Sequence, residues 1–576
     1  MQRFQEWLER RDWDEGATLM VFGAIIGFAS GLSVVGFYGL IDLAHLTFIQ
    51  FPQSRLPRVG QAFYLPLLTA FGLWAAWFVV FRTRTPEGQN VPDVQLAIAK
   101  RDGVIRSRPV VLRTIASALT LGSGGSAGSE GPVAVLGAGL GSSIARRLHF
   151  QPRHTKILVG CGAAAGIAAA FNAPFAGAFF ALEEVLGSFS VGAFSPVVIA
   201  SVVGALTVRP FFGGHPIFAS DVPASTRPVE ILMYPLLGIA CGFVSALYSR
   251  WYLKAIEIGK RMPGPRWLAP VIGGIAVGAI VLMSRGLLAG NGHLAIPAPI
   301  FGGMAWYALL AITLGKIVAT VVTLGFGGSG GVFTPTLFIG AALGGGLGVL
   351  GHELVPSLVR AHAWAFVGMG GMVAGATRAP LTAIFIGFEM TDDYTYVVPL
   401  MIVGVIAYVT SRWFAPHGLY DGWLAARGEH LAHGVDQSIM DHTHVGDAID
   451  RDVQPVPANA SIDDLIAAAA TTSHDVLPVT DDDGILVGLV NHHALRDAII
   501  VRDELGTVVL AADLAEPIEA VSPRDSLRRA LTVMNARGVD ALPIVESDDS
   551  RGPRFVGLLS RRDVFLVYEK SLATAV

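Results

Sequence analysis

The sequence predicts a polytopic α-helical membrane domain with discontinuous helices, followed by a soluble α/β domain. Of its 576 residues, 52% are hydrophobic and only 15% are charged, with 68 glycines and a mean hydropathy of +0.55. Soluble domains carry about 25% charged residues. Residues 431–576 hold 24 acidic and 12 basic side chains, a density that suits a soluble domain. We therefore predict a membrane domain over 1–428, a linker over 429–440 and a soluble domain over 441–576.

The apolar segments are of two kinds. A membrane-spanning helix needs about 20 apolar residues, and long runs of this kind occur at Thr18–Ile49, Phe63–Phe81, Val229–Leu253, Leu268–Met283, Met304–Leu324 and Val397–Trp413. Shorter runs, such as Ile157–Phe171 and Leu381–Phe388, are separated by Gly, Ser, Asn and Pro. Non-helical backbone at membrane depth is tolerated only inside protein or beside a water-filled cavity. The short runs therefore predict discontinuous helices that meet at a buried site.

Two motifs in the membrane domain occur twice. The glycine-rich segment Gly122–Pro132 is similar to Gly327–Pro335, and their final prolines are 203 residues apart. Ala168–Pro174 is similar to Ala374–Pro380, and here the prolines are 206 residues apart. Two motifs that repeat in the same order at nearly one offset predict a duplicated half. The two halves are expected at about residues 17–215 and 229–425.

The glycine-rich loops are candidates for anion binding. A loop of this kind before a helix presents unpaired backbone N–H groups at the positive end of the helix dipole, which attracts anions. Two such loops would bind a small anion through partial charges alone, weakly enough to release it again. Glycines also allow close helix packing. That alternative applies to many of the other glycines, but it does not account for a glutamate inside the first loop.

Glu130 is this glutamate, and it precedes an apolar helix. A carboxylate at membrane depth costs on the order of 2.5–3.5 kcal/mol. At a helix N-terminus it can occupy the place of an anion when ionised and leave that place when protonated. We predict that Glu130 is both the gate and a proton carrier. The alternative is a capping carboxylate without a role in transport.

Glu183 and Glu184 close an apolar helix that begins at Pro174. Adjacent residues on a helix point about 100° apart, so these two cannot share one role. We expect one to pair within the protein and the other to meet water and relay protons. The alternative is that both merely end the helix. Glu389 holds the equivalent place in the second half, and Lys316 is a lone cation in an apolar span; both are as compatible with a structural role as with a functional one.

Four motifs then occur in a characteristic order: Gly88–Asp93, Gly128–Pro132, Gly331–Pro335 and Gly418–Tyr420. In this order they resemble the signature loops of the CLC family of chloride channels and proton-coupled chloride exchangers, and the similarity extends from about residue 15 to 570. The resemblance implies a homodimer in which each subunit has an anion pathway built from two inverted halves.

The resemblance also assigns roles to single residues. Glu130 matches the external gating glutamate. Glu184 matches the internal proton-transfer glutamate of the exchangers, which favours an exchanger over a channel. The implied anion-binding residues are Gln89, Asn90, Gly128, Ser129, Glu130, Gly131, Val332, Phe333 and Tyr420. Gln89, Asn90 and Ser129 depart from the residues usual at these positions, which are serine, glycine and a basic residue. The anion selectivity therefore stays open.

The tail contains a second repeat. Leu477–Thr480 with Gly484–Val490 is similar to Leu542–Val545 with Phe555–Leu559, and a helical stretch precedes each. The pattern resembles a tandem CBS pair at about 441–505 and 510–572, which commonly binds adenine nucleotides such as ATP, ADP or AMP. Ser560 and Asp563 match the nucleotide-binding positions of the second repeat, whereas the first repeat has Ala494 in place of the aspartate. The alternative is a CBS pair that only assists dimerisation.

These observations predict the exchange of a small monovalent anion, chloride by expectation, for protons. We expect a multi-pass protein of a bacterial inner membrane with a regulatory CBS tail in the cytoplasm. The alternatives are a passive voltage- or pH-gated chloride channel of the same fold and an exchanger for nitrate or fluoride. Gly124–Gly128 satisfies the G-x-S-x-G pattern of hydrolases, but a helix precedes it rather than a strand. We therefore predict no enzyme activity. We also predict no metal site, no required cofactor and no nucleic-acid partner.

Overall fold

The computed structural model describes residues 15–53, 58–82, 90–214, 228–292, 296, 303–355, 360–429, 440, 443–472, 474–500, 509–548 and 552–567. Its contacts divide the chain into two compact units, Met1–Leu431 and Ala432–Val576. Each unit has a hydrophobic core of its own. Most of the predicted linker, 429–440, lies outside the described residues, as does the predicted anion ligand Gln89.

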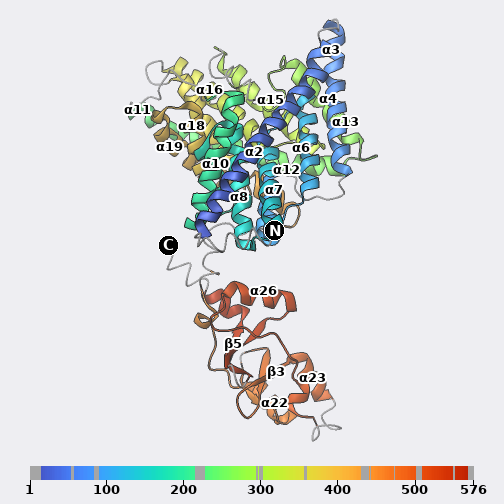
Figure 1. The fold of residues 1–576 in the computed structure, drawn as a ribbon, viewed down its shortest axis with the longest axis vertical. Helices are drawn as coiled ribbons and strands as arrows, with labels where there is room; N and C mark the ends of the chain where they lie inside the picture. Colours follow the sequence, from blue (N-terminus) through green and yellow to red (C-terminus); the bar gives the residue numbers. More distant parts are fainter. Residues whose placement is uncertain are drawn as a thin grey trace. The chain divides into compact units, whose positions relative to one another are not determined.

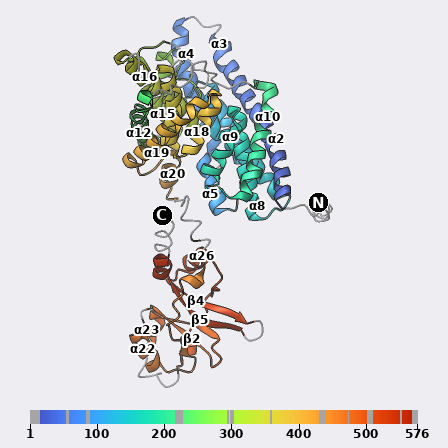
Figure 2. The same cartoon turned by 90° about the vertical axis from the view of Figure 1, so that its left-hand side faces the viewer.

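The described part of the first unit is helical (Figures 1 and 2). Its elements are α2 (Glu15–His45), η1 (Leu46–Gln50), α3 (Phe51–Gln53), α4 (Arg58–Phe81), α5 (Val91–Lys100), α6 (Ser107–Gly122), α7 (Glu130–Arg147), α8 (Pro152–Phe171), α9 (Pro174–Phe180), η2 (Ala181–Val185), α10 (Val191–Phe212), α11 (Pro228–Ile231), α12 (Tyr234–Arg261), α13 (Leu268–Met283), α15 (Trp306–Gly325), α16 (Phe333–Leu354), α17 (Ala361–Thr377), α18 (Pro380–Thr391), η4 (Tyr394–Tyr396), α19 (Val397–Phe414) and α20 (Leu419–Ala425). Within the described ranges, eight helical segments are long and apolar enough to cross a membrane. The predicted polytopic helical fold is confirmed.

The two halves of the first unit contain the same polar contacts in exchanged form. The backbone N–H of Ser126 donates to the hydroxyl of Thr323 at 3.1 Å. The N–H of Ser329, 203 residues after Ser126, donates at 3.0 Å to the hydroxyl of Thr120, which lies 203 residues before Thr323. A contact between two parts that recurs with the partners exchanged is the mark of a two-fold relation. The duplication expected from the sequence is therefore visible as pseudo-symmetry.

Many glycines serve the packing of helix pairs. A Cβ on Gly137 of α7 would lie 2.0 Å from the carbonyl oxygen of Gly162 on α8. In the second half, a Cβ on Gly340 of α16 would lie 2.4 Å from the carbonyl oxygen of Gly368 on α17. Such backbone contact between helices is open only to small residues. Part of the glycine excess therefore reflects two equivalent, closely packed helix pairs.

The second unit contains the two CBS repeats. The first consists of β1 (Val456–Pro457), α22 (Ile462–Thr471), β2 (Val476–Thr480), β3 (Leu486–Asn491) and α23 (His492–Ile500). Strand β2 pairs in parallel with β1 and antiparallel with β3. In the second repeat, a parallel bridge from Val521 to Ile544 takes the place of the β1 pairing. It is followed by α26 (Leu527–Arg537) and by the antiparallel pair β4 (Ala541–Asp548) and β5 (Gly552–Ser560). The predicted α/β pattern is confirmed.

Candidate anion-binding site

The two glycine-rich loops meet directly. The N–H of Gly128 donates to the carbonyl oxygen of Gly331 at 2.7 Å, and the N–H of Gly331 donates to that of Gly128 at the same distance. Helix α7 begins at Glu130 and α16 at Phe333, two residues after each glycine. The N-termini of two helices, one from each half, therefore converge where the repeat predicted an anion site.

The carboxylate of Glu130 crosses from its own helix to the other half. Its Oε1 accepts a hydrogen bond from the Thr334 N–H at 2.9 Å, and its Oε2 accepts one from the Thr334 hydroxyl. Glu130 is buried, with 2% of its surface exposed. The carboxylate thus covers the N-terminus of α16, where the sequence placed the anion.

Both loop glycines leave the room that this carboxylate needs. A Cβ on Gly128 would lie 1.8 Å from the Oε1 of Glu130, and a Cβ on Gly331 would lie 2.7 Å from the same atom. Neither distance is compatible with a side chain at the glycine unless the carboxylate moves. These positions require glycine for space rather than for backbone conformation.

A small cavity lies beside the two loops. Four of the predicted anion-binding residues line it: Asn90, Gly131, Val332 and Tyr420. Its volume is about 10 Å³, close to the roughly 10–15 Å³ that accommodates one water molecule. Tyr252 and Trp423 complete much of its wall. The structure therefore brings together segments that are more than 300 residues apart at a space of the size of one small ion.

Two further predicted residues point elsewhere. The Ser129 hydroxyl lies 3.3 Å from the hydroxyl of Tyr38 on α2. The ring of Phe333 is fully buried between Phe171 and Phe180, with ring centroids 5.8 and 5.9 Å away. Only the backbone of Phe333 is therefore placed to meet an anion.

The neighbouring glutamates of η2 have different surroundings. Gln95 on α5 donates through its amide nitrogen to the Glu184 carboxylate at 2.9 Å and to the Glu184 carbonyl oxygen at 2.6 Å. The Glu183 carboxylate instead accepts from the N–H groups of Leu381 and Thr382, at 3.1 and 2.8 Å. Those residues begin α18, so Glu183 caps a helix of the other half. Glu184 is the buried member of the pair that is free of this capping role.

Glu389 repeats the role of Glu183 with the halves exchanged. Its carboxylate accepts from the N–H groups of Phe175 and Ala176, at 2.9 and 2.7 Å. These residues begin α9. The two caps form a reciprocal pair, and each fixes the start of a helix in the opposite half.

Lys316 has a structural environment. Its buried Nζ donates to the carbonyl oxygens of Leu288 and Gly290, at 3.1 and 3.0 Å. The Gly290 oxygen also accepts from the Ala127 N–H in the first glycine-rich loop, at 3.2 Å. Lys316 therefore supports the loop that holds Glu130.

Sequence reasoning missed three residues that hold the site in place. Thr334 occupies one of the two variable positions of the Gly331–Pro335 motif, so the motif itself does not predict a role for it. Gln95 was recognisable as an amide in the apolar helix α5. Asp93 accepts from Arg427 at 3.1 Å and so ties α5 to the end of α20, which carries Tyr420.

In the CBS unit, Ser560 and Asp563 lie together at the start of the helix over 561–567. The carboxylate oxygen Oδ2 of Asp563 accepts from the Ser560 N–H at 3.0 Å and from the Ser560 hydroxyl at 2.5 Å. In the first repeat, Asn491 accepts from the Ala494 N–H at 2.8 Å. The two repeats thus share the helix start, and only the second has a carboxylate there.

Residues 71–412, more than half of the chain, match the family model described as the voltage gated chloride channel, and residues 445–501 and 511–570 each match that of the CBS domain. The chain belongs to the CLC family. Curated relatives of this CLC chain include a "chloride channel protein ClcB-like" of Ralstonia nicotianae, 36% identical over 62% of the chain and 84% of the relative. Another is the H(+)/Cl(-) exchange transporter ClcA of Yersinia pseudotuberculosis, 30% identical over 71% of the chain and 87% of the relative.

Solved structures of CLC proteins share its fold. A slow cyanobacterial Cl−/H+ antiporter has a TM-score of 0.65 at 24% identity, over 71% of the CLC chain and 97% of the antiporter. A eukaryotic CLC transporter has a TM-score of 0.64 at 19% identity and covers 95% of the chain and 97% of its own. A CLC-type fluoride/proton antiporter has a TM-score of 0.59 at 25% identity, over 71% and 99%. These relatives are transporters and not enzymes, in agreement with the prediction.

Proposed function

We propose that this CLC protein exchanges chloride for protons across a membrane, with Glu130 as the gate. The observation that carries the proposal is the Glu130 carboxylate bound to the N–H and the hydroxyl of Thr334, in the first turn of α16. Those groups attract either a carboxylate or a free anion, but not both at one place. Protonation removes the charge that holds the carboxylate there, so an anion replaces it. One proton is thereby tied to the entry of an anion.

Glu184 is proposed as the second proton-transfer residue. Its carboxylate is buried and bonded to one amide, Gln95, while its neighbour Glu183 has the capping role. A carboxylate at membrane depth has a high energetic cost, so its presence there points to a function. The name of the Yersinia pseudotuberculosis relative, an H(+)/Cl(-) exchange transporter, supports exchange over passive conduction.

The test is flux in liposomes that contain the purified full chain. With equal pH on both sides, an outward chloride gradient should drive protons into the liposomes. A pH electrode and a chloride electrode record the two fluxes. A passive channel would release chloride when a potassium ionophore supplies the counter-ion, yet move no protons. That result would exclude the exchanger.

A second candidate substrate is fluoride. Asn90 lines the small cavity at a position where the family resemblance implies glycine, and one of the similar structures is a fluoride/proton antiporter. An amide N–H₂ can donate two hydrogen bonds to an anion. Parallel efflux with chloride, nitrate and fluoride decides between them, because an exchanger selective for fluoride should move chloride at least tenfold more slowly.

We also propose a homodimer in a bacterial inner membrane, with the CBS unit in the cytoplasm and an adenine nucleotide near Asp563. The place of Asp563 at a helix start in the second repeat supports the nucleotide site. Labelling of single cysteines introduced in the CBS unit tests its sidedness, and cross-linking of the detergent-purified chain tests the dimer. Neither the transport proposal nor the fold depends on these results.

A further inference from the structure

A second cavity adjoins the small one and is much larger than a single ion requires. Its volume is about 440 Å³, whereas one water molecule takes up roughly 30 Å³ in the liquid. Pockets that bind organic small molecules have volumes of about 300–1,000 Å³. The size of this cavity therefore suits an organic ligand.

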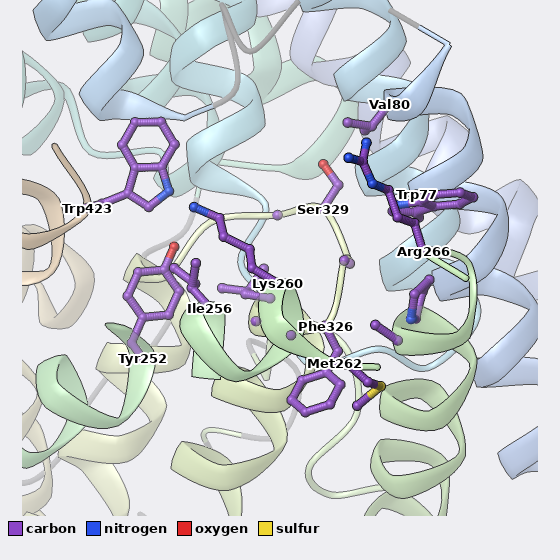
Figure 3. A pocket seen from close by; sticks show the side chains of 18 of the residues that line it. Trp77, Val80, Tyr252, Ile256, Lys260, Met262, Arg266, Phe326, Ser329 and Trp423 are labelled. Atoms are coloured by element: carbon purple, nitrogen blue, oxygen red, sulfur yellow. The ribbon is translucent and has the colours of Figure 1, made fainter. Parts of the chain in front are cut away.

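The cavity adjoins the candidate anion site. It is lined by the end of α12, the start of α13, the loop between α15 and α16, and the end of α20 (Figure 3). Four residues line both cavities: Asn90, Tyr252, Gly330 and Trp423. A ligand in the large cavity would therefore stand in the path to the small one. Ala426 and Arg427, which follow α20, line the cavity, so it lies at the described C-terminal end of the membrane unit.

The lining carries a surplus of positive charge. Its charged members are Arg113, Lys260, Arg266 and Arg427, and no Asp or Glu occurs among the described residues that line it. Lys260 and Arg266 are exposed and pair with no carboxylate within the described ranges. Among the described residues, the buried Nε of Arg113 has no hydrogen-bond partner. Arg427 differs because it is paired with Asp93. Lys260 and Arg266 thus remain for a ligand, and Arg113, whose charge also interacts with Asp93, adds to the positive charge of the wall.

Aromatic rings complete the wall. Trp77, Tyr252 and Trp423 line the cavity, and Figure 3 shows Trp77 on the same side as Arg266, opposite Tyr252 and Trp423. One face of Trp423 is covered by the guanidinium of Arg427, 3.6 Å from the ring centroid. Trp77 is half-buried and lines the cavity, and its ring is stacked on that of Phe81 with centroids 5.0 Å apart, which leaves one ring face for a ligand. Cations bind phosphate groups and aromatic rings stack on a planar base.

We propose that this cavity binds a nucleoside polyphosphate, with the phosphates against Arg113, Lys260 and Arg266 and the base against Trp77. Occupation closes the path from this face to the candidate anion site, so the nucleotide inhibits transport. This site is separate from the one expected near Asp563 in the CBS unit, and it goes beyond the proposed exchange of chloride for protons.

The test measures equilibrium binding of ATP to the full chain in detergent, where transport plays no part. All variants carry Asp563→Ala, which removes the carboxylate expected to bind a nucleotide in the CBS unit. Adding Lys260→Gln and Arg266→Gln together should raise the Kd for ATP at least tenfold. The matched control is Arg261→Gln. Arg261 has the same charge at the same end of α12, pairs with Glu257 at 2.9 Å and does not line the cavity, so the control should change the Kd less than twofold.

Two results would overturn the proposal: loss of all ATP binding with Asp563→Ala alone, or an unchanged Kd in the Lys260→Gln/Arg266→Gln chain. Inorganic triphosphate should bind at least fivefold more weakly than ATP, and equal affinity would refute the role of Trp77. In liposomes, ATP on the cavity face should slow chloride flux of the Asp563→Ala chain. Each variant is compared with its own flux without ATP, and equal inhibition of the double variant would contradict closure of the path.

Discussion

The two halves of the membrane unit share a backbone plan but differ in their buried carboxylates. Glu183 has its counterpart in Glu389, 206 residues later, and both cap a helix of the opposite half. The counterpart of Glu184 at the same offset is Met390, and the counterpart of Glu130 at an offset of 203 is Phe333. The carboxylates with a structural task occur twice, whereas those proposed to carry protons occur once. Pseudo-symmetry thus separates the two roles within a single sequence.

The buried cations, like the capping carboxylates, occur once in each half, but their contacts differ. Lys316 is the counterpart of Arg113, 203 residues later. Lys316 donates to two carbonyl oxygens, whereas the Nε of Arg113 has no partner in the described part of the chain and the residue lines the large cavity. Position is conserved between the halves here, but only one cation is committed to holding a loop.

The largest effect is expected at the gate. Glu130→Gln keeps the shape of the side chain but removes its charge and its titration, so proton movement should fall at least 100-fold while chloride flux continues. Proton and chloride fluxes of the same liposome preparation measure this. Coupling that survives the substitution would show that Glu130 does not carry the proton.

The next effect is expected at Glu184. Glu184→Met installs the residue of the other half, Met390, and should slow proton movement at least tenfold with a smaller loss of chloride flux. Glu184→Gln retains an amide beside Gln95 and serves as the polar control; it should give the same proton defect. Normal proton flux in both variants would place proton transfer elsewhere.

The capping pair should respond in stability rather than in coupling. Glu183→Gln and Glu389→Gln each weaken a charged helix cap, which is worth about 1–2 kcal/mol. Both variants should unfold at lower temperature in detergent, measured as the loss of monodisperse protein on size-exclusion chromatography after heating. The ratio of proton to chloride flux should be unchanged. A changed ratio in one variant alone would mean that the two caps are not equivalent.

The smallest effect is expected at Ser129. Ser129→Val again installs the residue of the other half, Val332, and removes a long hydrogen bond to Tyr38. Because the hydroxyl is directed to Tyr38, chloride flux should change less than threefold. A tenfold loss would indicate that this hydroxyl binds the anion during transport. Ser129→Thr, which keeps the hydroxyl, would then restore the flux.

Much of the fold was predictable because the repeats are written in local sequence. Glycine-rich loops and Ala-Pro turns determine where helices begin, and their repetition at offsets of 203 and 206 residues predicted a duplicated half. The sequence could also place Glu130 at a helix N-terminus. It could not show that the carboxylate reaches the helix of the other half, since that depends on how two loops 203 residues apart pack.

The supporting residues were harder to predict for the same reason. Thr334 and Gln95 act through a single contact with a residue far away in the sequence, and nothing in their own neighbourhood marks it. Helix geometry predicted different surroundings for Glu183 and Glu184, and the family resemblance assigned proton transfer to Glu184. The capping contacts of Glu183 with the start of α18 could not be predicted, because they join residues almost 200 positions apart.

The exchanged caps also have a consequence for synthesis of the protein. The start of α9 is completed by Glu389, more than 200 residues later in the chain. When a ribosome has made the first half alone, the N–H groups at Phe175 and Ala176 have no such acceptor, and the Glu130 carboxylate has no α16 to rest on. We therefore expect these helix starts to be completed only after the second half has been made.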